Sequence, residues 1–501
     1  MSFAIFKERT LRRLIRDFST SNALVALVGA GASVESGLPS WKELVEAALL
    51  RAASDAGFSL TDDEKASWVS DTIRRDDLLG AMAIADALIK EPISSWLPDI
   101  LYSGKGADAY QPGPISRQVA NLRAAFGDHL DIATTNYDDL LEVALERHRD
   151  IKVPIVPFTG DQSKRPRTEH VAVAHPHGYY GRTGHHGQTI LTLEQYHRSQ
   201  RGSSWQETHL GEKIMEKDCL FVGMSMTDSN ILRYLDFYAQ RKQRHAALIV
   251  RQRQPDATLA LQSAHEVSIA ARWAKRGVKA VFLDHYADIA YVLHEIAYCR
   301  EVGRNSYKPL DVRCAKWISS VERLLIAPGN PGRFRKGQEA MNDVLRETLG
   351  AALNAVAESG VDITRDKLAM SLWLLSRDGT RLTCWSSTDR LQIDSDTIVP
   401  VPLDEESKWI AVSAVCKGTQ VVGVPGGATP TSTSRWGYIV GLPLHVKPPN
   451  DGILPIGCLT IASMQSREDT ILTNMPEDVQ ASVNSSIRKA IANFLMEASK
   501  P

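Results

Sequence analysis

The amino-acid sequence predicts an α/β domain with a doubly wound parallel sheet, followed by a separate α+β domain with an antiparallel sheet. Three observations support this fold class. Short apolar runs alternate with helical patterns as far as residue 295, a stretch rich in proline and glycine interrupts the chain at 327–337, and two hairpin signals follow in the last third. With 501 residues, the chain is also too long for one ordinary hydrophobic core.

The first domain is assigned to residues 1–295. Two of its runs, Leu24–Val28 and Ala246–Val250, are apolar throughout, which is typical of central parallel strands. Helical spacing lies between the runs, for example over Trp41–Ala53 and Ile231–Lys242. Strands are predicted at Leu24–Val28, His129–Thr134, Val153–Pro157, Val171–His175, Thr189–Leu193, Cys219–Val222, Ala246–Val250 and Lys279–Leu283.

A linker with a short helix is assigned to residues 296–337. Arg300–Arg313 is polar and has no clear period, and Ala327–Gly337 holds two prolines and three glycines. A helix is predicted between these two stretches, at Cys314–Ile326.

The second domain is assigned to residues 338–501. Hairpins flanked by helices predict an antiparallel α+β module. Its predicted elements are a helix at Gln338–Ser359, a hairpin around Arg377–Thr380, a hairpin around Lys447–Ile453 and a last helix at Pro476–Ala498.

The composition excludes several classes of protein. Hydrophobic residues make up 43% of the chain, and the formal net charge of −1 gives no sign of binding to nucleic acid or to an anionic membrane. The six cysteines never form a Cys-x-x-Cys pair, so neither a zinc ribbon nor a disulfide framework is expected. No run approaches the ~20 apolar residues of a membrane span, and the N-terminus lacks the apolar core of a signal peptide. We therefore expect a cytoplasmic protein.

A glycine-rich turn follows the first predicted strand. Gly29-Ala30-Gly31-Ala32-Ser33 comes directly after Leu24–Val28, and glycines at such a turn let the backbone approach a pyrophosphate closely. The third glycine of the dinucleotide fingerprint is missing because Val34 takes its place, and a loop precedes the helix that Ser40 is expected to cap. A loop of this kind would cover a dinucleotide. The alternative is a structural turn built from small residues.

Polar residues also follow three later strands. Because the carboxyl ends of parallel strands meet at one edge of a doubly wound sheet, we expect these residues and the glycine turn to share one crevice. The alternatives are that the first pair only caps the next helix and that a single histidine is structural. The residues are Asn136 and Asp138 after the second strand, His175 and His177 after the fourth, and Gly223, Ser225, Asp228 and Asn230 after the sixth.

In this order, GAGAS…SGLPSW, TTNYD, HPHG, ILTLEQY and FVGMSMTD resemble the signature series of the sirtuin, or SIR2-like, fold. The resemblance covers about residues 20–290, and it is greatest to the bacterial branch found in the NAD+-hydrolysing enzymes of antiphage defence. It implies a Rossmann-like sheet of the sirtuin type with NAD+ as the substrate.

The resemblance implies two catalytic residues. Asn136 would position the attacking water or the ribose hydroxyls, and His177 would be the catalytic base, whereas His175 matches no essential position. Such a sparse site suits the reaction, since nicotinamide leaves NAD+ as a neutral molecule and needs no general acid. Water is the expected acceptor, which gives ADP-ribose and nicotinamide. Cyclisation of the ribose stays open.

The other matched residues would bind NAD+. The glycine turn would contact the pyrophosphate and the nicotinamide ribose, Asp138 would lie near the nicotinamide carboxamide, and the end of the sixth strand would hold the adenosine side. The residues of the turn are Gly29, Ala30, Gly31 and Ser33, and those of the sixth strand's end are Gly223, Ser225 and Asp228.

The chain departs from the protein deacylases of this family. It has no cysteine between His177 and Cys219, where those enzymes carry a zinc ribbon, so neither zinc nor another metal is expected. The segment that grips an acyl-lysine peptide is also replaced, by Phe221-Val222-Gly223-Met224. A protein deacylase or ADP-ribosyltransferase remains one alternative to a hydrolase. A sensor that binds NAD+ or ADP-ribose without turnover is another.

The C-terminal part resembles a GAF-type domain for small-molecule binding or dimerisation. The resemblance depends on its long helix, on the hairpin around Asp378-Gly379 and on the apolar strands that flank 447–453, and another α+β module of similar layout stays open. Trp385, Trp409 and Trp436 would line a pocket or pack in the core. We expect a homo-oligomeric effector of abortive antiphage defence that depletes NAD+ once a small molecule or a protein acts on this domain.

Overall fold

The computed structural model describes residues 3–160, 170–199, 205–224, 228–237, 242–251, 258–327, 329–391, 398–404, 407–424, 436–449 and 451–499. The chain divides into two compact units. The parallel-sheet unit comprises Ile15–Leu283 and Ile289–Arg304, and the antiparallel-sheet unit comprises Met1–Leu14, Asp284–Asp288 and Asn305–Pro501. This division does not test the domain boundaries predicted at 295 and 337, which therefore stay predictions.

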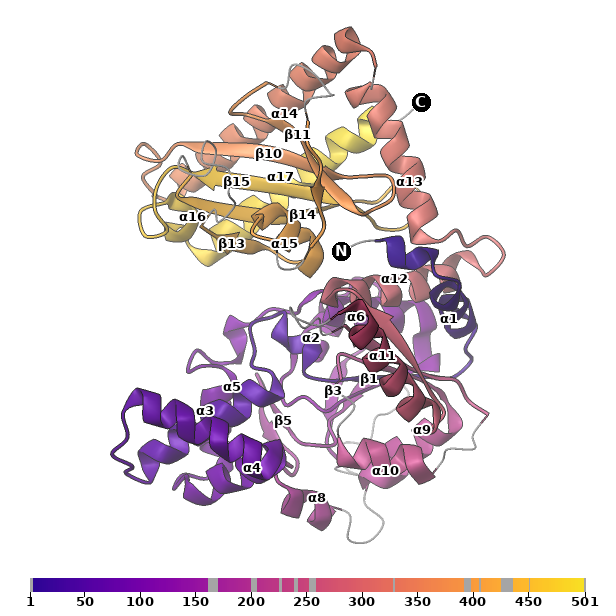
Figure 1. Ribbon diagram of the computed structural model, residues 1–501, viewed down its shortest axis with the longest axis vertical. Coiled ribbons are helices and arrows are strands. Elements are labelled where there is room, and N and C mark those ends of the chain that lie inside the picture. Colours follow the sequence, from indigo (N-terminus) through magenta and orange to yellow (C-terminus); the bar gives the residue numbers. More distant parts are fainter. Residues whose placement is uncertain are drawn as a thin grey trace. The chain divides into compact units, whose positions relative to one another are not determined.

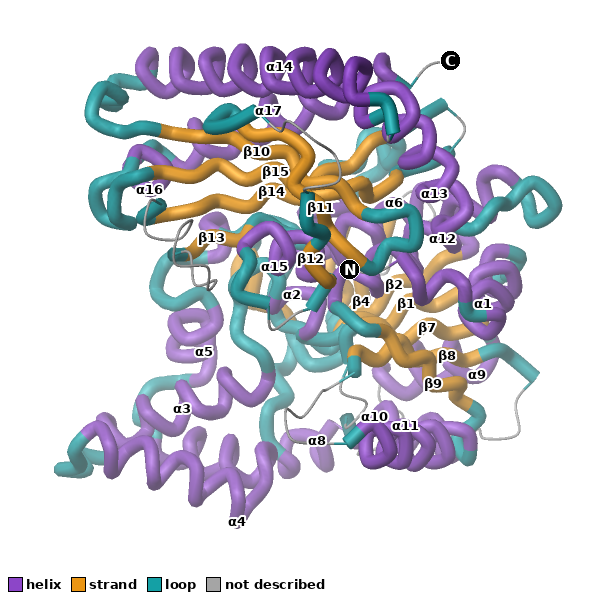
Figure 2. Tube along the Cα trace, turned by 45° about the horizontal axis from the view of Figure 1, so that its top comes forward, coloured by secondary structure: helices purple, strands orange, loops and turns teal. Residues whose placement is uncertain are grey.

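Seven parallel strands form the sheet of the first unit, in the order β3-β4-β2-β1-β7-β8-β9. Figure 2 shows β4, β2, β1, β7, β8 and β9 side by side in this order. The doubly wound parallel sheet predicted from the apolar runs is therefore confirmed. The strands are β1 (Leu24–Val28), β2 (Leu130–Thr134), β3 (Ile155–Phe158), β4 (Val171–Ala174), β7 (Asp218–Val222), β8 (His245–Val250) and β9 (Val278–Leu283).

The order of the strands reverses beside β1, and the candidate site lies at this reversal. The chain leaves β1 towards β2, β4 and β3, then returns to β7 on the other side of β1. The strand ends are in register, because Val28 pairs with Thr134 on one side and with Val222 on the other. The residues that follow β1, β2 and β7 therefore start at the same level, at a switch point where doubly wound sheets bind ligands.

The predicted strand Thr189–Leu193 is wrong. Residues 189–191 belong to no strand, and α8 begins at Leu193. The backbone amides of Leu191 and Thr192 donate to the side-chain oxygen of Gln195, at 2.7 and 3.1 Å, as residues at a helix start do. The run is apolar because Ile190 and Leu191 are fully buried, and burial alone does not distinguish a strand from an extended loop.

Helices surround the sheet, and α3, α4 and α5 pack together beside it (Figure 1). The helix predicted at Trp41–Ala53 is confirmed as α3, and the side chain of Ser40 accepts from the Glu43 amide as its N-cap. The helices are α1 (Arg9–Ser19), α2 (Gly31–Val34), α3 (Trp41–Asp55), α4 (Asp62–Leu88), α5 (Ile93–Leu101), α6 (Pro114–Phe126), α7 (Leu140–Glu146), α8 (Leu193–Ser199), α9 (Glu212–Glu216), α10 (Ser229–Phe237), α11 (Leu259–Ala274) and α12 (Tyr286–Val302), of which α1 and α12 cross the unit boundary.

The second unit holds an antiparallel sheet in the order β12-β11-β10-β15-β14-β13. Both predicted hairpins are confirmed, as β10–β11 and β14–β15. The strands are β10 (Leu368–Leu375), β11 (Arg381–Ser387), β12 (Val401–Pro402), β13 (Val421–Gly423), β14 (Tyr438–Val446) and β15 (Leu454–Ser463), and the helices are α13 (Leu310–Val321), α14 (Pro331–Glu358), α15 (Ile410–Lys417), α16 (Ile471–Asn474) and α17 (Glu477–Ala498).

The helix predicted at Gln338–Ser359 begins earlier than expected. It starts at Pro331, and the side chain of Asn330 accepts from the Arg333 amide as its N-cap. Proline is favoured in the first turn of a helix because its missing N–H has no partner there in any case. The proline in this part of the predicted linker therefore starts a helix.

A small cavity of about 20 Å³ lies between the sheet of the second unit and helices α14, α16 and α17. It is lined almost entirely by apolar side chains, with Gln480 and Asn484 as the polar exceptions. A cavity of this size holds about one water molecule. Trp385, Trp409 and Trp436 do not line it, so their predicted part in a pocket finds no support at this cavity.

Candidate functional site

The glycine turn after β1 packs directly against the turn after β7. The Gly29 amide donates to the Val222 carbonyl and the Gly31 amide to the Gly223 carbonyl, both at 2.9 Å. A Cβ atom at Gly29 or Gly31 would lie 2.8 or 2.9 Å from the Gly223 carbonyl oxygen. The glycines thus have a packing function at the switch point. A one-turn helix, α2, starts at Gly31, where the sequence predicted only a loop.

We expect Gly31→Ala to lower the free energy of unfolding by roughly 1–3 kcal/mol, because the new methyl group meets the backbone of Gly223 directly after β7. Gly350→Ala is the matched control, since its Cβ would meet nothing within 4 Å and alanine is favoured within a helix. Urea unfolding of the two variants measures the difference. Equal free energies of unfolding for the two variants would show that the turns after β1 and β7 move apart easily to admit the methyl group.

Asn136 lies at the end of β2 with its carboxamide buried. Its Nδ2 donates to the Gly29 carbonyl at 3.2 Å and to Ser33 Oγ at 2.9 Å. The residue is 7% exposed, and among the residues that the structure describes its buried Oδ1 has no hydrogen-bond partner. An unpartnered buried acceptor is costly, so it indicates an atom that a ligand or water satisfies.

Asp138 lies next to this carboxamide. Its Oδ2 accepts the Ser33 hydroxyl at 2.7 Å, and its Oδ1 accepts the Leu140 amide at 3.1 Å, near the start of α7. Burial raises the pKa of Asp138 to about 6, although these two hydrogen bonds lower it. Asp138 thus accepts the first amide of α7, whose N-cap residue is Asp139, and it also contacts Ser33 in the site.

His177 forms a cluster with Asp228 and Tyr196. Its Nε2 lies 3.1 Å from Asp228 Oδ2 and 3.3 Å from the Tyr196 hydroxyl, and this hydroxyl donates to the same carboxylate oxygen at 2.8 Å. Burial raises the pKa of Asp228, but His177 and hydrogen bonds from Tyr196 and the Ile231 amide lower it to a value below its usual range. Asp228 is thus an ionised partner that orients the imidazole.

His175 is held by two acceptors. Its Nδ1 lies 3.1 Å from the Asn136 carbonyl oxygen and its Nε2 lies 2.7 Å from Glu142 Oε1. Burial lowers the pKa of His175, but the adjacent Glu142 charge raises it above its usual value. Through these two contacts, His175 joins the Glu142 side chain to the backbone of Asn136.

Backbone contacts hold these loops together. The Tyr180 amide donates to the Tyr137 carbonyl at 2.6 Å, and the Ile190 amide donates to the His177 carbonyl at 3.0 Å. The Tyr137 hydroxyl in turn donates to the Ile190 carbonyl at 2.7 Å. The segment around Ile190 therefore joins the loops after β2 and β4.

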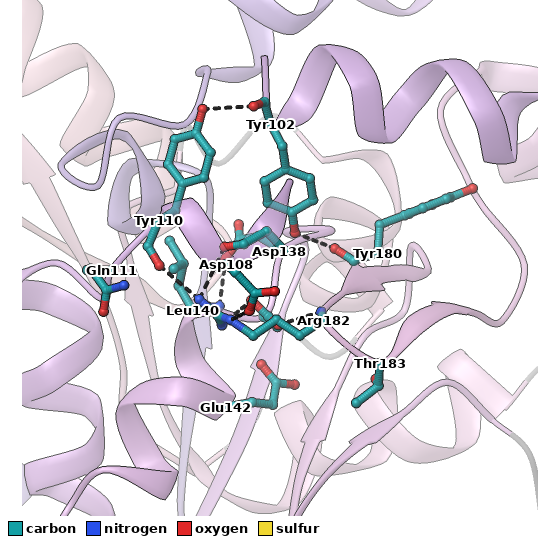
Figure 3. Close-up of polar contacts among 12 residues, drawn as sticks. Tyr102, Asp108, Tyr110, Gln111, Asp138, Leu140, Glu142, Tyr180, Arg182 and Thr183 are labelled. Carbon is teal, nitrogen blue, oxygen red and sulfur yellow. Dashed lines mark hydrogen bonds and ion pairs between the residues drawn. The ribbon is translucent and has the colours of Figure 1, made fainter. Parts of the chain in front are cut away.

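Arg182 reinforces the same region (Figure 3). Its guanidinium group bonds Asp139 at 2.9 Å, Asp108 at 2.7 Å and the Tyr110 carbonyl at 2.8 Å. Tyr102 donates to the Tyr180 carbonyl beside it. These contacts attach the segment before α6 to the start of α7, directly after Asp138.

The structure brings together most of the predicted site residues. Gly29, Ser33, Asn136 and Asp138 form one hydrogen-bonded group, and His177 lies with Asp228 in a second. Ala30 is the half-buried N-cap residue of α2. Gly223 adopts the left-handed φ of +62° and contacts the glycine turn. Ser225 lies outside the described residues.

Sequence reasoning assigned no function to Tyr196 or Glu142, and it placed Asp228 on the adenosine side. Tyr196 lies within the quoted ILTLEQY motif, which was the available signal, whereas Glu142 is an ordinary residue of an amphipathic helix pattern. Among the described residues, no group of three or more histidine, cysteine, aspartate or glutamate side chains could hold a metal ion.

Two solved structures are similar to parts of this chain. A mutant Sir2 homologue in complex with ADP-ribose is 15% identical and covers 58% of this chain and 98% of its own, with a TM-score of 0.31. A GAF sensor protein from Burkholderia vietnamiensis is 14% identical and covers 37% of this chain and 92% of its own, with a TM-score of 0.19.

Two curated relatives also match the chain. The NAD(+) hydrolase ThsA of Bacillus cereus (strain MSX-D12) is 27% identical over 32% of this chain and 35% of that protein. The NAD(+) hydrolase ThsA of Acinetobacter baumannii (strain 532279) is 24% identical over 57% of this chain and 55% of that protein. The matched region thus spans about a third and about half of the lengths of these relatives.

The family comparison covers β4 and β7 and most of β2, but not β1 with its glycine turn. Residues 131–280 match the family model of the SIR2-like domain. This range contains the Asn136, His177 and Asp228 motifs. Residues 131–280 of this chain are therefore similar to the SIR2-like domain, the family that the order of the motifs also resembles.

Proposed function

We propose that this chain is a SIR2-family NAD+ glycohydrolase that cleaves NAD+ with water to nicotinamide and ADP-ribose. The observation that carries the proposal is the buried Oδ1 of Asn136 at the switch point of the sheet, which finds no hydrogen-bond partner in the described part of the chain. An acceptor there fits the O–H groups of a water molecule or of the substrate ribose. The two relatives named NAD(+) hydrolase support this choice of substrate.

The hydrogen bonds of His177 suit a general base. Because the Tyr196 hydroxyl gives its proton to Asp228, it faces Nε2 of His177 as an acceptor, as Asp228 also does. Nε2 is therefore the protonated nitrogen of the base form, and Nδ1 would accept the proton from water. The negative charge of Asp228 then stabilises the imidazolium that forms.

The charges of the reaction balance on these groups. The bond between the anomeric carbon and the nicotinamide nitrogen breaks, and its electron pair neutralises the pyridinium charge of the leaving group. Water forms the new C–O bond and gives its proton to His177. Asn136 contributes orientation without adding a charge.

Asp228→Asn distinguishes two functions for this carboxylate. If Asp228 orients His177, we expect kcat to fall by about 10²-fold, because the imidazolium loses its counter-charge. The KM for NAD+ should stay within about threefold, because substrate binding does not depend on this contact. Steady-state kinetics measures both constants. A raised KM with an unchanged kcat would instead support the adenosine contact that the resemblance implied.

We also propose the setting in which this activity is used. Uncontrolled NAD+ depletion harms the host cell, which favours a gated, cytoplasmic, homo-oligomeric effector of abortive antiphage defence, triggered by a small molecule or a protein that acts on the antiparallel-sheet unit. The likeness of that unit to a GAF domain belongs to this proposal. None of the helices in the described ranges combines the length and the hydropathy needed to cross a bilayer.

The remaining binding functions and the absence of zinc are also part of the proposal. Gly29, Ala30, Gly31 and Ser33 would face the pyrophosphate and ribose, and Gly223 with Ser225 would face the adenosine side. We expect chelators to leave the activity unchanged.

The experiment that tests the proposal is a chromatographic assay of free nicotinamide after the purified full chain is incubated with NAD+. We expect steady release. Binding of NAD+ without release would favour the alternative of a non-catalytic sensor.

A further inference from the structure

The contacts of Asp138 indicate a different function from the one that the resemblance implied. We propose that Asp138 is a positioning residue, which acts through Ser33 to determine the atom that the Asn136 carboxamide presents to the substrate. This inference rests on the proposed function of the site. It makes the Asp138–Ser33–Asn136 chain, and not a contact with the nicotinamide carboxamide, the reason why an aspartate is needed there.

The carboxamide nitrogen of Asn136 has two protons, and both are used. One is donated to the Gly29 carbonyl at 3.2 Å and the other to Ser33 Oγ at 2.9 Å. A backbone carbonyl can only accept, so the nitrogen must face Gly29. The second contact is less restrictive, because a serine hydroxyl can donate or accept.

Asp138 removes this freedom. The hydroxyl of Ser33 has a single proton, and Asp138 Oδ2 accepts it at 2.7 Å. Ser33 can then only accept from Asn136, which keeps the nitrogen of the carboxamide turned towards it. The Asp138 carboxylate therefore determines the direction of both hydrogen bonds of Ser33, and it reinforces the orientation of the carboxamide that the Gly29 carbonyl also favours.

The result is a site with a defined polarity. Oδ1 of Asn136 is buried and has no partner within the described residues. A carboxamide oxygen attracts O–H donors and repels phosphate oxygens and carbonyls. The hydrogen-bonded series Asp138–Ser33–Asn136 thus selects a ribose hydroxyl or the attacking water as the group that contacts Asn136. It also disfavours the flipped carboxamide, in which the nitrogen would take the place of Oδ1.

ADP-ribose is the probe that separates the two functions of Asp138. It lacks nicotinamide, and its anomeric hydroxyl carries the oxygen that water delivers in the proposed reaction. A direct contact between Asp138 and nicotinamide would affect binding of NAD+ alone. A positioning function through Ser33 and Asn136 would affect binding of ADP-ribose as well.

We would measure the dissociation constants of ADP-ribose and NAD+ by calorimetry for the full chain and its variants. For Asp138→Asn and Ser33→Ala we expect the dissociation constant of ADP-ribose to rise about tenfold, the usual effect of one hydrogen bond. Because both substitutions act through the same series of hydrogen bonds, the dissociation constant of the double variant should rise by a similar factor and not by the product of the two single factors.

The variants and the control keep the result interpretable. Burial raises the pKa of Asp138 to about 6, so its charge is costly at neutral pH and Asp138→Asn is expected to fold. Asp128→Asn is the matched control, because its side chain is 89% exposed, and it should leave both dissociation constants unchanged.

An unchanged affinity for ADP-ribose in Asp138→Asn, with weaker NAD+ binding, would overturn the proposal in favour of the nicotinamide contact. Multiplicative effects of the two substitutions would overturn it as well. These outcomes are distinct from failure of the proposed function. A parent chain that binds ADP-ribose without releasing nicotinamide would contradict hydrolysis, while the calorimetry would still decide how Asp138 acts.

Discussion

Replacement of Asn136 with alanine is expected to lower kcat for nicotinamide release by about 10²- to 10³-fold, the effect of removing one preorganised polar group from a reacting centre. The reason is the loss of Oδ1, the buried acceptor that would orient water or a ribose hydroxyl. The substitution also removes two hydrogen bonds, to Gly29 and Ser33, so the free energy of unfolding should fall by only about 1–2 kcal/mol. Kinetics and urea unfolding of the same preparation separate the two effects.

Asn22→Ala is the control for this experiment, because Asn22 is exposed and lies at the opposite end of β1 from the glycine turn. It should retain full activity. If Asn136→Ala retained the activity of the parent chain, the assignment of Asn136 to the reacting centre would be wrong.

His177→Ala is expected to lower kcat by about 10²- to 10⁴-fold, the range for loss of a general base. The same change leaves Asp228 without the imidazole that contacts its Oδ2 at 3.1 Å. Because the carboxyl pKa is held below its usual range by His177, it should rise in the variant, and the stability that the ionised carboxylate contributes should be lost at a higher pH on acidification. Activity and the pH dependence of unfolding are the two measurements.

His197→Ala provides the matched control. His197 is exposed and follows Tyr196 directly on α8, so its loss removes an imidazole without disturbing the cluster. Equal activity losses in both variants would indicate a general effect on folding and not a function in proton transfer.

The sheet could be predicted because its strands are buried on both faces. Every residue of β1 and β7 is buried, and such apolar runs bounded by polar turns are recognisable without other information. The same reasoning failed at Thr189–Leu193, where burial of an extended loop produced the pattern of a strand. A local apolar pattern in the sequence indicates that a segment is buried. Whether the segment pairs as a strand depends on its neighbours in the fold, which the local pattern does not contain.

The site could be predicted as a set of strand ends, but its pairings could not. Asn136 and His177 follow their strands in sequence, and the topology then brings them to one edge of the sheet. The contacts of Asp228 with His177 and of Asp138 with Ser33 join residues that are distant in the chain, so neither spacing nor composition specifies them. These pairings changed the expected function of both aspartates.

The measurement that tests the central claim most directly is the product balance of the full chain with NAD+. Nicotinamide and ADP-ribose are quantified by chromatography for the parent chain and for Asn136→Ala under the same conditions. The account predicts one ADP-ribose for each nicotinamide from the parent chain and little of either from the variant. Intact NAD+ after incubation with the parent chain, or equal product from both proteins, would contradict it.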